Sequence, residues 1–289
     1  MKFSPLAAVA AVSAAALTVP ASANHSWNNY HWATTNGTLA VRVNAAVTSA
    51  WTSYVNEAIV DWEVSPDLLL GVGNFVSVNR RKCNPIGREI LVCNDLYGQR
   101  GWLGIASIWL DGNGHITQGT TKLNDTYFTM TRYNTPAWRR MVTCQETGHD
   151  FGLAHQDENF SNINLGSCMD YTNDPSGTAG TNGTASNEHP NPHDYEQLAT
   201  IYNHTNDGYN SATSSSPTGL GARASGEASA LSLPSAPSGD SPAEWGRAID
   251  TDGLGRPDVF MKELGGGHRV ITHVFWALET KRGDIQGQQ

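Results

Sequence analysis

The segment from residue 145 to residue 155 constrains the fold more than any other part of this sequence. It reads Gln-Glu-Thr-Gly-His-Asp-Phe-Gly-Leu-Ala-His, so that Gln145 and His149 are four positions apart and His155 follows six positions later. On a helix, residues four apart lie on one face, whereas a residue six positions further on is turned roughly 120° away. His149 and His155 can therefore meet only if the helix ends between them. Gly152 is the residue best able to adopt the left-handed conformation that ends a helix.

The start of the same helix is also predicted by the sequence. Thr135 is a suitable N-cap, and Pro136 suits the first helical position, where its missing N–H costs nothing. Residues 137–148 then give about three turns, with an apolar stripe formed by Trp138, Met141 and Val142. We expect a helix from about residue 136 to residue 148 that presents Gln145 and His149 on one face.

Two motifs in this region resemble the metzincin superfamily of zinc endopeptidases. The first is the signature His-Glu-x-x-His-x-x-Gly-x-x-His, matched here by Glu146, His149, Gly152 and His155, with Gln145 in place of the first histidine. The second, residues 167–171, is similar to the Met-turn beneath the metal of that superfamily. The resemblance covers about residues 30–203 and is closest to matrixin-like secreted bacterial members. It implies an α/β (α+β) fold with a twisted mixed sheet, long helices and a Met-turn.

The resemblance implies one catalytic zinc ion, for which His149 and His155 are expected ligands. Gln145 is the expected third ligand, although an amide oxygen is a poorer zinc donor than an imidazole. Three outcomes stay open for this position. Gln145 ligates through its carbonyl oxygen, Tyr171 or Asp157 completes the site, or the site is degenerate and inactive.

The resemblance also implies roles in hydrolysis. Glu146 is the expected general base, which accepts a proton from water and passes it to the departing amine. Met169 lies at the base of the site, and Tyr171 is a fifth ligand or a transition-state stabiliser. Members of the superfamily receive the substrate as an extended strand beside an edge strand, for which residues 101–110 are the candidate, although their apolar pattern equally suits a central strand.

The expected function is that of a secreted zinc-dependent endopeptidase acting on a protein or peptide substrate. The alternative is a catalytically inactive relative that binds peptide or matrix ligands through the same cleft. The turn at residues 111–114 favours a plain hairpin over a calcium site, so that Ca²⁺ is without support as a cofactor. The histidine-containing segment at residues 189–193 could complete the metal site, but its sequence favours a surface loop that leads into a helix.

The first residues predict export. Residues 1–23 contain Lys2, an apolar run over residues 6–19, and the small residues 21–23 typical of a signal-peptide cleavage site. The apolar run is too short for a membrane-spanning helix, so we expect an extracellular protein without a membrane anchor. The net charge of −9 argues against a nucleic-acid partner, and we expect a monomer.

The four cysteines of an exported chain predict two disulfides. Of the three possible pairings, we favour Cys83–Cys93, which closes a short loop, and Cys144–Cys168. The second pair would join the metal-site helix to the Met-turn. Metal binding by these cysteines is disfavoured because the sequence has no Cys-x-x-Cys pair.

The rest of the chain predicts an alternation of strands and helices followed by a change in composition. Strands are expected at residues 39–43, 68–78, 101–110 and 115–123, and helices at residues 48–62 and near 192–202. The metzincin-like catalytic domain then spans residues 24–205. Residues 206–240 are rich in Ser, Ala, Gly, Thr and Pro, which predicts a flexible linker. Residues 241–289 predict a small C-terminal β-rich appendage of unassigned role.

Overall fold

The computed structural model describes residues 24–71, 78–203, 206–212 and 239–287. The predicted signal peptide and most of the predicted linker lie outside these residues. The strands are β1 (His31–Trp32), β2 (Leu39–Ala46), β3 (Leu68–Gly71), β4 (Ile90–Asp95), β5 (Trp102–Leu110), β6 (His115–Asn124), β7 (Arg247–Thr251), β8 (Pro257–Gly265) and β9 (His268–Trp276). The helices are α1 (Ser49–Trp62), α2 (Asp125–Phe128), α3 (Pro136–Asp150), α4 (Pro192–Tyr202), α5 (Pro242–Trp245) and α6 (Arg282–Gln286).

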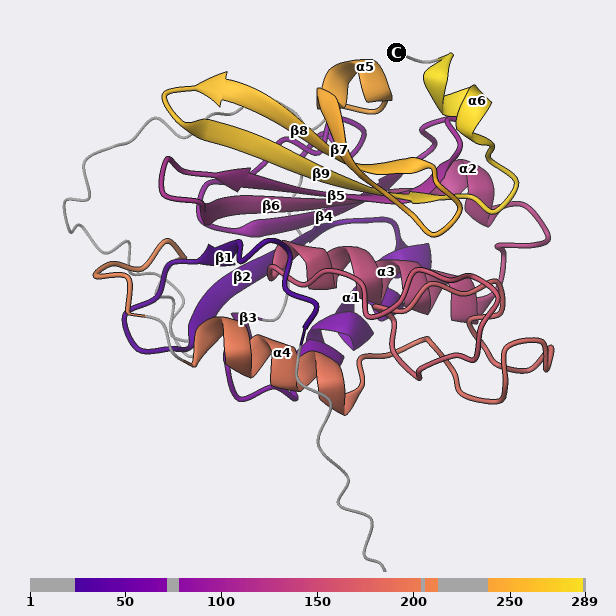
Figure 1. The fold of residues 1–289 in the computed structure, drawn as a ribbon, viewed down its shortest axis with the longest axis horizontal. Helices are drawn as coiled ribbons and strands as arrows, with labels where there is room; N and C mark the ends of the chain where they lie inside the picture. Colours follow the sequence, from indigo (N-terminus) through magenta and orange to yellow (C-terminus); the bar gives the residue numbers. More distant parts are fainter. Residues whose placement is uncertain (1–23, 72–77, 204–205, 213–238, 288–289) are drawn as a thin grey trace, which may run out of the picture.

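A single mixed sheet organises the molecule, as the sequence predicts. Its strands follow the order β3-β2-β4-β6-β5-β9-β8-β7, and β1 pairs with β6 off this path. The pairs among β2, β3, β4 and β6 are parallel, whereas β5, β7, β8 and β9 pair in antiparallel fashion. Figure 1 shows α1 and α3 side by side against one face of this sheet. None of the described helices is long and apolar enough to cross a membrane.

Local signals set the helix boundaries close to their predicted positions. Thr135 caps α3 by accepting a hydrogen bond from the backbone N–H of Trp138, and Pro136 is the first helical residue. Asn191 forms a capping box with Asp194 at the start of α4. The strand predicted over residues 68–78 is β3, which ends at Gly71; residues 72–77 lie outside the described part. Strand β4 was not predicted from the sequence.

The prediction that residues 101–110 form an edge strand is wrong, and its alternative, a central strand, is correct. All nine residues of β5 are buried, because β6 pairs along one side of the strand and β9 along the other. The β9 pairing runs the length of β5, from Trp102 opposite Trp276 to Leu110 opposite Arg269.

The C-terminal β-rich segment does not form a separate appendage. Its strands β7, β8 and β9 extend the main sheet beyond β5, as the uppermost strands in Figure 1. Alternation along β9 sends Ile271 and Phe275 into the main hydrophobic core, while Val274 and Trp276 join a second core on the opposite face. Because both faces of β9 are buried among residues of the first part of the chain, the segment is part of one folded unit.

Candidate metal centre

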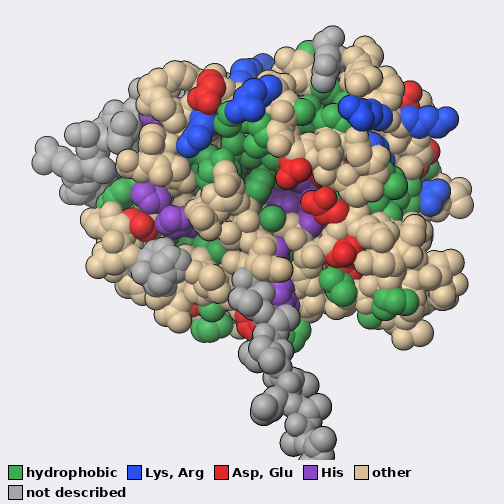
Figure 2. Space-filling model, viewed as in Figure 1, with side chains coloured by type: hydrophobic (Ala, Val, Ile, Leu, Met, Phe, Trp, Pro, Cys, Tyr) green, Lys and Arg blue, Asp and Glu red, His purple; other side chains and the backbone are tan. Residues whose placement is uncertain are grey.

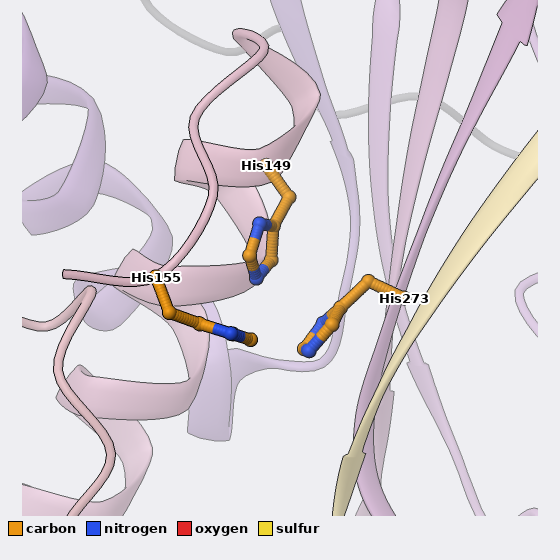
Figure 3. Close-up of side chains that lie close together, drawn as sticks. All are labelled: His149, His155 and His273. Atoms are coloured by element: carbon orange, nitrogen blue, oxygen red, sulfur yellow. The ribbon is translucent and has the colours of Figure 1, made fainter. Parts of the chain in front are cut away.

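Three histidines from different parts of the chain meet beside the C-terminal end of α3. They are His149 on α3, His155 in the loop that follows, and His273 on β9 (Figure 3). One ring nitrogen from each lies within 4.8 Å of the others, and the ring centroids are 4.0 to 4.9 Å apart. The structure therefore brings together two of the three predicted ligands with a histidine that the sequence analysis missed.

The turn after α3 folds as its glycine predicts. Gly152 has a φ of +93°, and a Cβ there would lie 2.1 Å from the backbone oxygen of Tyr30. The N–H of Trp27 donates to the Gly152 carbonyl at 2.7 Å, which holds the N-terminal segment against this turn. A side chain at residue 152 would thus collide with backbone, and only glycine fits where the chain turns His155 back towards His149.

Each histidine of this centre is fixed through its Nδ1 atom. Nδ1 of His149 lies 2.8 Å from the Leu153 carbonyl oxygen, and Nδ1 of His155 lies 3.1 Å from a Glu158 carboxylate oxygen. Nδ1 of His273 lies 3.1 Å from Oε2 of Glu146. Such partners favour the tautomer with the proton on Nδ1, which leaves the Nε2 lone pairs available to a metal ion.

The Nε2 atoms have few partners within the protein. Those of His149 and His155 are buried and without any hydrogen bond, whereas Nε2 of His273 lies 2.9 Å from the hydroxyl of Tyr171. Burial lowers the pKa values of His149 and His273 well below the usual range of histidine, because desolvation disfavours the imidazolium. The rings are neutral near pH 7, which is the form that binds a metal ion.

The predicted role of Gln145, as a third ligand through its carbonyl oxygen, stays a prediction. Its Nε2 donates a hydrogen bond of 2.7 Å to the carbonyl oxygen of Cys168, while its Oε1 is buried without a hydrogen-bond partner. His273 supplies the third imidazole of this centre. Asp157, the other alternative, is engaged by the backbone N–H of Asn159 and the amide of Asn162.

Glu146 lies behind His273 in a fully buried position. Its Oε2 faces Nδ1 of His273, while its Oε1 is buried without a hydrogen-bond partner. A Cβ on Gly104 of β5 would approach Oε1 to 2.8 Å, so the carboxyl packs directly beneath that strand. Burial, helped by the charge of nearby Asp150, raises the pKa of Glu146 well above its usual range. The contact with His273 is the carboxylate–histidine arrangement common around protein-bound zinc.

Tyr171 forms the wall of the centre on the side of the Met-turn. Its hydroxyl lies 2.9 Å from Nε2 of His273 and 3.5 Å from an oxygen of Asp258 on β8. Its ring packs against the rings of His155 and Phe160, with centroids 4.2 and 4.5 Å away. The hydroxyl is thus held beside the ring nitrogen of His273.

The segment at residues 167–171, which resembles a Met-turn, packs against α3 at Gly148. Met169 is fully buried, and its sulfur would lie 2.6 Å from a Cβ on Gly148. The disulfide Cys144–Cys168 connects the helix to the turn, and the disulfide Cys83–Cys93 closes the short loop before β4. Both favoured pairings are present, and they account for all four cysteines.

His273 carries only a weak signal in the sequence. It lies in the apolar run from Val270 to Trp276, where a single histidine is most simply read as part of a buried strand. The position becomes informative once the alternation of β9 is known, because Ile271 and Phe275 share its face and both reach the main core beside α3.

Access to the centre is narrow in this structure. The side chains of His149, Glu146 and His273 are buried, and that of His155 is 5% exposed. Figure 2 shows histidine side chains in the middle of this face, beneath acidic ones. A cavity of about 620 Å³, lined by Trp27, Ala154 and residues of β7, β8 and β9, lies next to the centre. Trp27, which lines this cavity, has its ring centroid 5.3 Å from that of His149.

Comparison with known proteins gives a limited likeness. No family model matches the chain, and no curated protein matches it. One similar solved structure is high choriolytic enzyme 1, a hatching-enzyme zinc protease of the medaka fish Oryzias latipes. It has 10% identity and a TM-score of 0.34 over 61% of this chain and 95% of that one. Another is myroilysin, with 13% identity and a TM-score of 0.34 over 62% of this chain and 98% of that one. At such values the likeness assigns no residue a role.

Proposed function

We propose that this chain is a secreted zinc-dependent endopeptidase of the metzincin type whose zinc ion is bound by His149, His155 and His273. The observation that carries the proposal is the convergence of three imidazoles, each held through Nδ1, with nitrogens within 4.8 Å of one another. Three protein ligands with one further position for water or substrate are typical of catalytic zinc sites. The two disulfides agree with export to an oxidising compartment.

The donor set fits zinc better than the hard cations. Imidazole nitrogen suits Zn²⁺, whereas Mg²⁺ and Ca²⁺ prefer carboxylate and carbonyl oxygen. When bound, zinc would polarise the scissile carbonyl and lower the pKa of a water molecule towards neutrality. A divalent cation would also offset the unfavourable burial of the Glu146 carboxylate behind His273.

The surrounding residues can perform the remaining steps. Oε2 of Glu146 orients His273, and for Glu146 to accept a proton from water its carboxyl would have to turn out from beneath β5, where its Oε1 lies. The Tyr171 hydroxyl, 2.9 Å from Nε2 of His273, is placed to donate to an oxyanion that develops beside the metal. Burial keeps this hydroxyl protonated, because it raises the pKa of Tyr171 well above its usual value.

The position of β9 favours a second candidate function. An extended substrate cannot pair with β5 while β9 occupies that side of the strand, so cleavage requires either displacement of the C-terminal strands or entry past Trp27 from the neighbouring cavity. A catalytically silent relative that keeps the zinc ion and binds peptides or matrix material has no need to bring a scissile bond to the metal. This alternative is favoured by the pairing of β9 along β5 and by the engagement of Glu146 with His273.

One set of assays separates the two candidates. The full chain, loaded with zinc, is assayed on a quenched casein-type substrate with and without a chelator, beside Glu146→Gln, Tyr171→Phe and the half-exposed control Glu57→Gln. A peptidase loses cleavage with the chelator, and kcat/KM falls at least about 100-fold in Glu146→Gln and about 100-fold in Tyr171→Phe, while the control keeps wild-type activity. Stoichiometric zinc without cleavage by the wild type selects the silent relative. Cleavage that survives both the chelator and Glu146→Gln contradicts the zinc-peptidase proposal.

A further inference from the structure

A second group of metal-ligating side chains lies away from the metal centre, where β1 pairs with β6. It consists of His31 on β1, His115 at the start of β6, and Asp207 in the segment after α4, with one ligand atom of each within 4.8 Å of the others. Figure 2 shows two histidine side chains beside an acidic one at the left of the molecule. We propose that these three residues form a second metal site, which binds a divalent transition-metal ion such as zinc.

Hydrogen bonds on the far side of each ring fix how the two histidines are protonated. Nδ1 of His31 lies 2.8 Å from the carbonyl oxygen of Asn29, which can only accept, so the proton is on Nδ1. Nδ1 of His115 lies 2.8 Å from the hydroxyl of Tyr209, and that hydroxyl donates to a carboxylate oxygen of Asp111 at 2.6 Å. The hydroxyl therefore accepts from Nδ1 of His115. With Nδ1 of each ring engaged in this way, Nε2 is the nitrogen that faces away from these partners and is available to a metal ion.

The two Nε2 atoms lie near the same carboxylate oxygen. Nε2 of His31 is 3.6 Å and Nε2 of His115 is 3.5 Å from Oδ1 of Asp207, and Nε2 of His31 is buried without a hydrogen bond. Two imidazole acceptors and a carboxylate oxygen repel one another unless a cation or additional protons lie between them. A metal cation bound by the three atoms would remove this repulsion.

The spacing suits a tetrahedral ion better than hydrogen bonds. Ligand bonds of about 2.0 to 2.1 Å at tetrahedral angles place neighbouring ligand atoms about 3.4 Å apart, close to the separations seen here. An N–H···O hydrogen bond is shorter, about 2.7 to 3.2 Å. Elsewhere in the same structure, His189 and Asp61 form such a direct contact at 2.7 Å. The Asp207 contacts are too long to be of this type.

The carboxylate ligand is held in place by backbone. The other oxygen of Asp207 accepts from the N–H of Thr34 at 2.9 Å, and the N–H of Asp207 donates to the carbonyl of Thr34 at 2.9 Å. The side chains of His31, His115 and Asp207 are 20%, 14% and 17% exposed. An ion bound here would have a fourth position open to water and would connect β1, β6 and the segment that follows α4.

Zinc stoichiometry of the full chain tests the proposal independently of the centre formed by His149, His155 and His273. Wild-type protein, dialysed against micromolar zinc and then metal-free buffer, should hold two zinc ions per chain. Asp207→Asn and His115→Gln should each hold one, and His273→Gln should also hold one through the other centre. The control His189→Gln, which alters a directly bonded His–Asp pair, should keep two.

Thermal unfolding provides a readout that does not depend on activity or on the other centre. In the His273→Gln background, added zinc should raise Tm, because an ion that binds only the folded state stabilises it. The same addition should leave Tm unchanged in His273→Gln/Asp207→Asn and in His273→Gln/His115→Gln. Equal Tm values of all three proteins in chelator would show that the second substitutions leave the fold intact. Wild-type zinc content in both Asp207→Asn and His115→Gln, or an equal zinc-induced rise in the double variants, overturns the proposal.

Discussion

At the scale of single residues, the positions of Gln145 and His273 decide which ligands a metal ion would find beside His149 and His155. Gln145 occupies a helix position that faces the Met-turn, and its amide is bonded to the carbonyl of Cys168. His273 reaches the same region from β9 and is oriented by Glu146. In the proposed zinc site, His273 would supply a ligand from a strand, and Glu146 would position it.

Glu146→Gln should weaken zinc binding as well as activity. The variant keeps the shape of the side chain but removes the carboxylate that accepts from Nδ1 of His273, and loss of such a partner typically costs about 10- to 100-fold in metal affinity. Competition with a chromophoric chelator measures the change, with Glu263→Gln, on an exposed part of β8, as the control. Equal affinities in the wild type and Glu146→Gln would contradict the positioning role.

His25 should make the fold sensitive to acid. Desolvation lowers its pKa to about 4, so the folded chain leaves His25 neutral while the unfolded chain protonates it below about pH 6.5. The unfolded state then binds more protons, and the free energy of unfolding falls as the pH decreases from about 6.5 to about 4. The contact of 3.6 Å to Asp194 does not reverse this, because burial raises the pKa of that carboxyl to about 7 and both groups favour their neutral forms.

Comparison with His25→Gln isolates this effect from the other titrating groups. Between pH 7 and pH 4, the wild type should lose up to about 3 kcal/mol of stability relative to the variant, measured by urea unfolding at each pH. A difference between the two proteins that stays constant with pH, or that grows in favour of the wild type on acidification, would contradict the neutral state of His25.

At the scale of elements, β9 joins the C-terminal segment to the first part of the chain, although the composition of residues 206–240 predicts a linker between them. It completes the sheet beside β5, carries His273 on one face, and contributes Val274 and Trp276 to the second core. The segment from residue 242 to residue 286 should therefore unfold together with the rest of the molecule. An independent appendage would unfold in a transition of its own.

Val274→Ala tests this cooperativity. Val274 is fully buried, and its truncation should cost about 2 kcal/mol through lost burial and a small cavity. Tryptophan fluorescence and far-ultraviolet circular dichroism should then report one common urea transition, shifted to lower concentration as a whole. Two separate transitions, of which only one responds to the substitution, would show that β7, β8 and β9 fold independently.

The two disulfides should differ in their effect on the metal centre. Each closes a loop, of 10 residues for Cys83–Cys93 and 24 for Cys144–Cys168, and loss of either should cost about 3 kcal/mol of stability in the chain-entropy account. Only the second connects α3 to the Met-turn. The double variant Cys144→Ala/Cys168→Ala should therefore bind zinc more weakly, whereas Cys83→Ala/Cys93→Ala should keep wild-type affinity, as measured by chelator competition. Equal affinities of the two double variants would contradict this assignment.

At the scale of the whole molecule, the sequence predicts what depends on near neighbours. Thr135, Pro136 and Gly152 act through hydrogen bonds and backbone conformation within a few residues, so the bounds of α3 and the turn towards His155 are predicted correctly. The partner of β5 is different, because nothing local distinguishes an edge strand from a central one when every residue is apolar. His273 escaped prediction for the same reason, since its role depends on strand pairing between distant parts of the chain.

Zinc affinity tests the central claim most directly when it is measured by chelator competition in the Asp207→Asn background, where the proposed second site cannot contribute. Full-length protein with His273→Gln is compared with Gln145→Ala and with the unaltered background. We predict that His273→Gln lowers the zinc affinity at least about 100-fold, because loss of a ligand should cost more than loss of the ligand's hydrogen-bond partner, which typically costs about 10- to 100-fold. We predict that Gln145→Ala retains tight zinc binding. Loss of binding in Gln145→Ala with full binding in His273→Gln would contradict a zinc ion held by His149, His155 and His273.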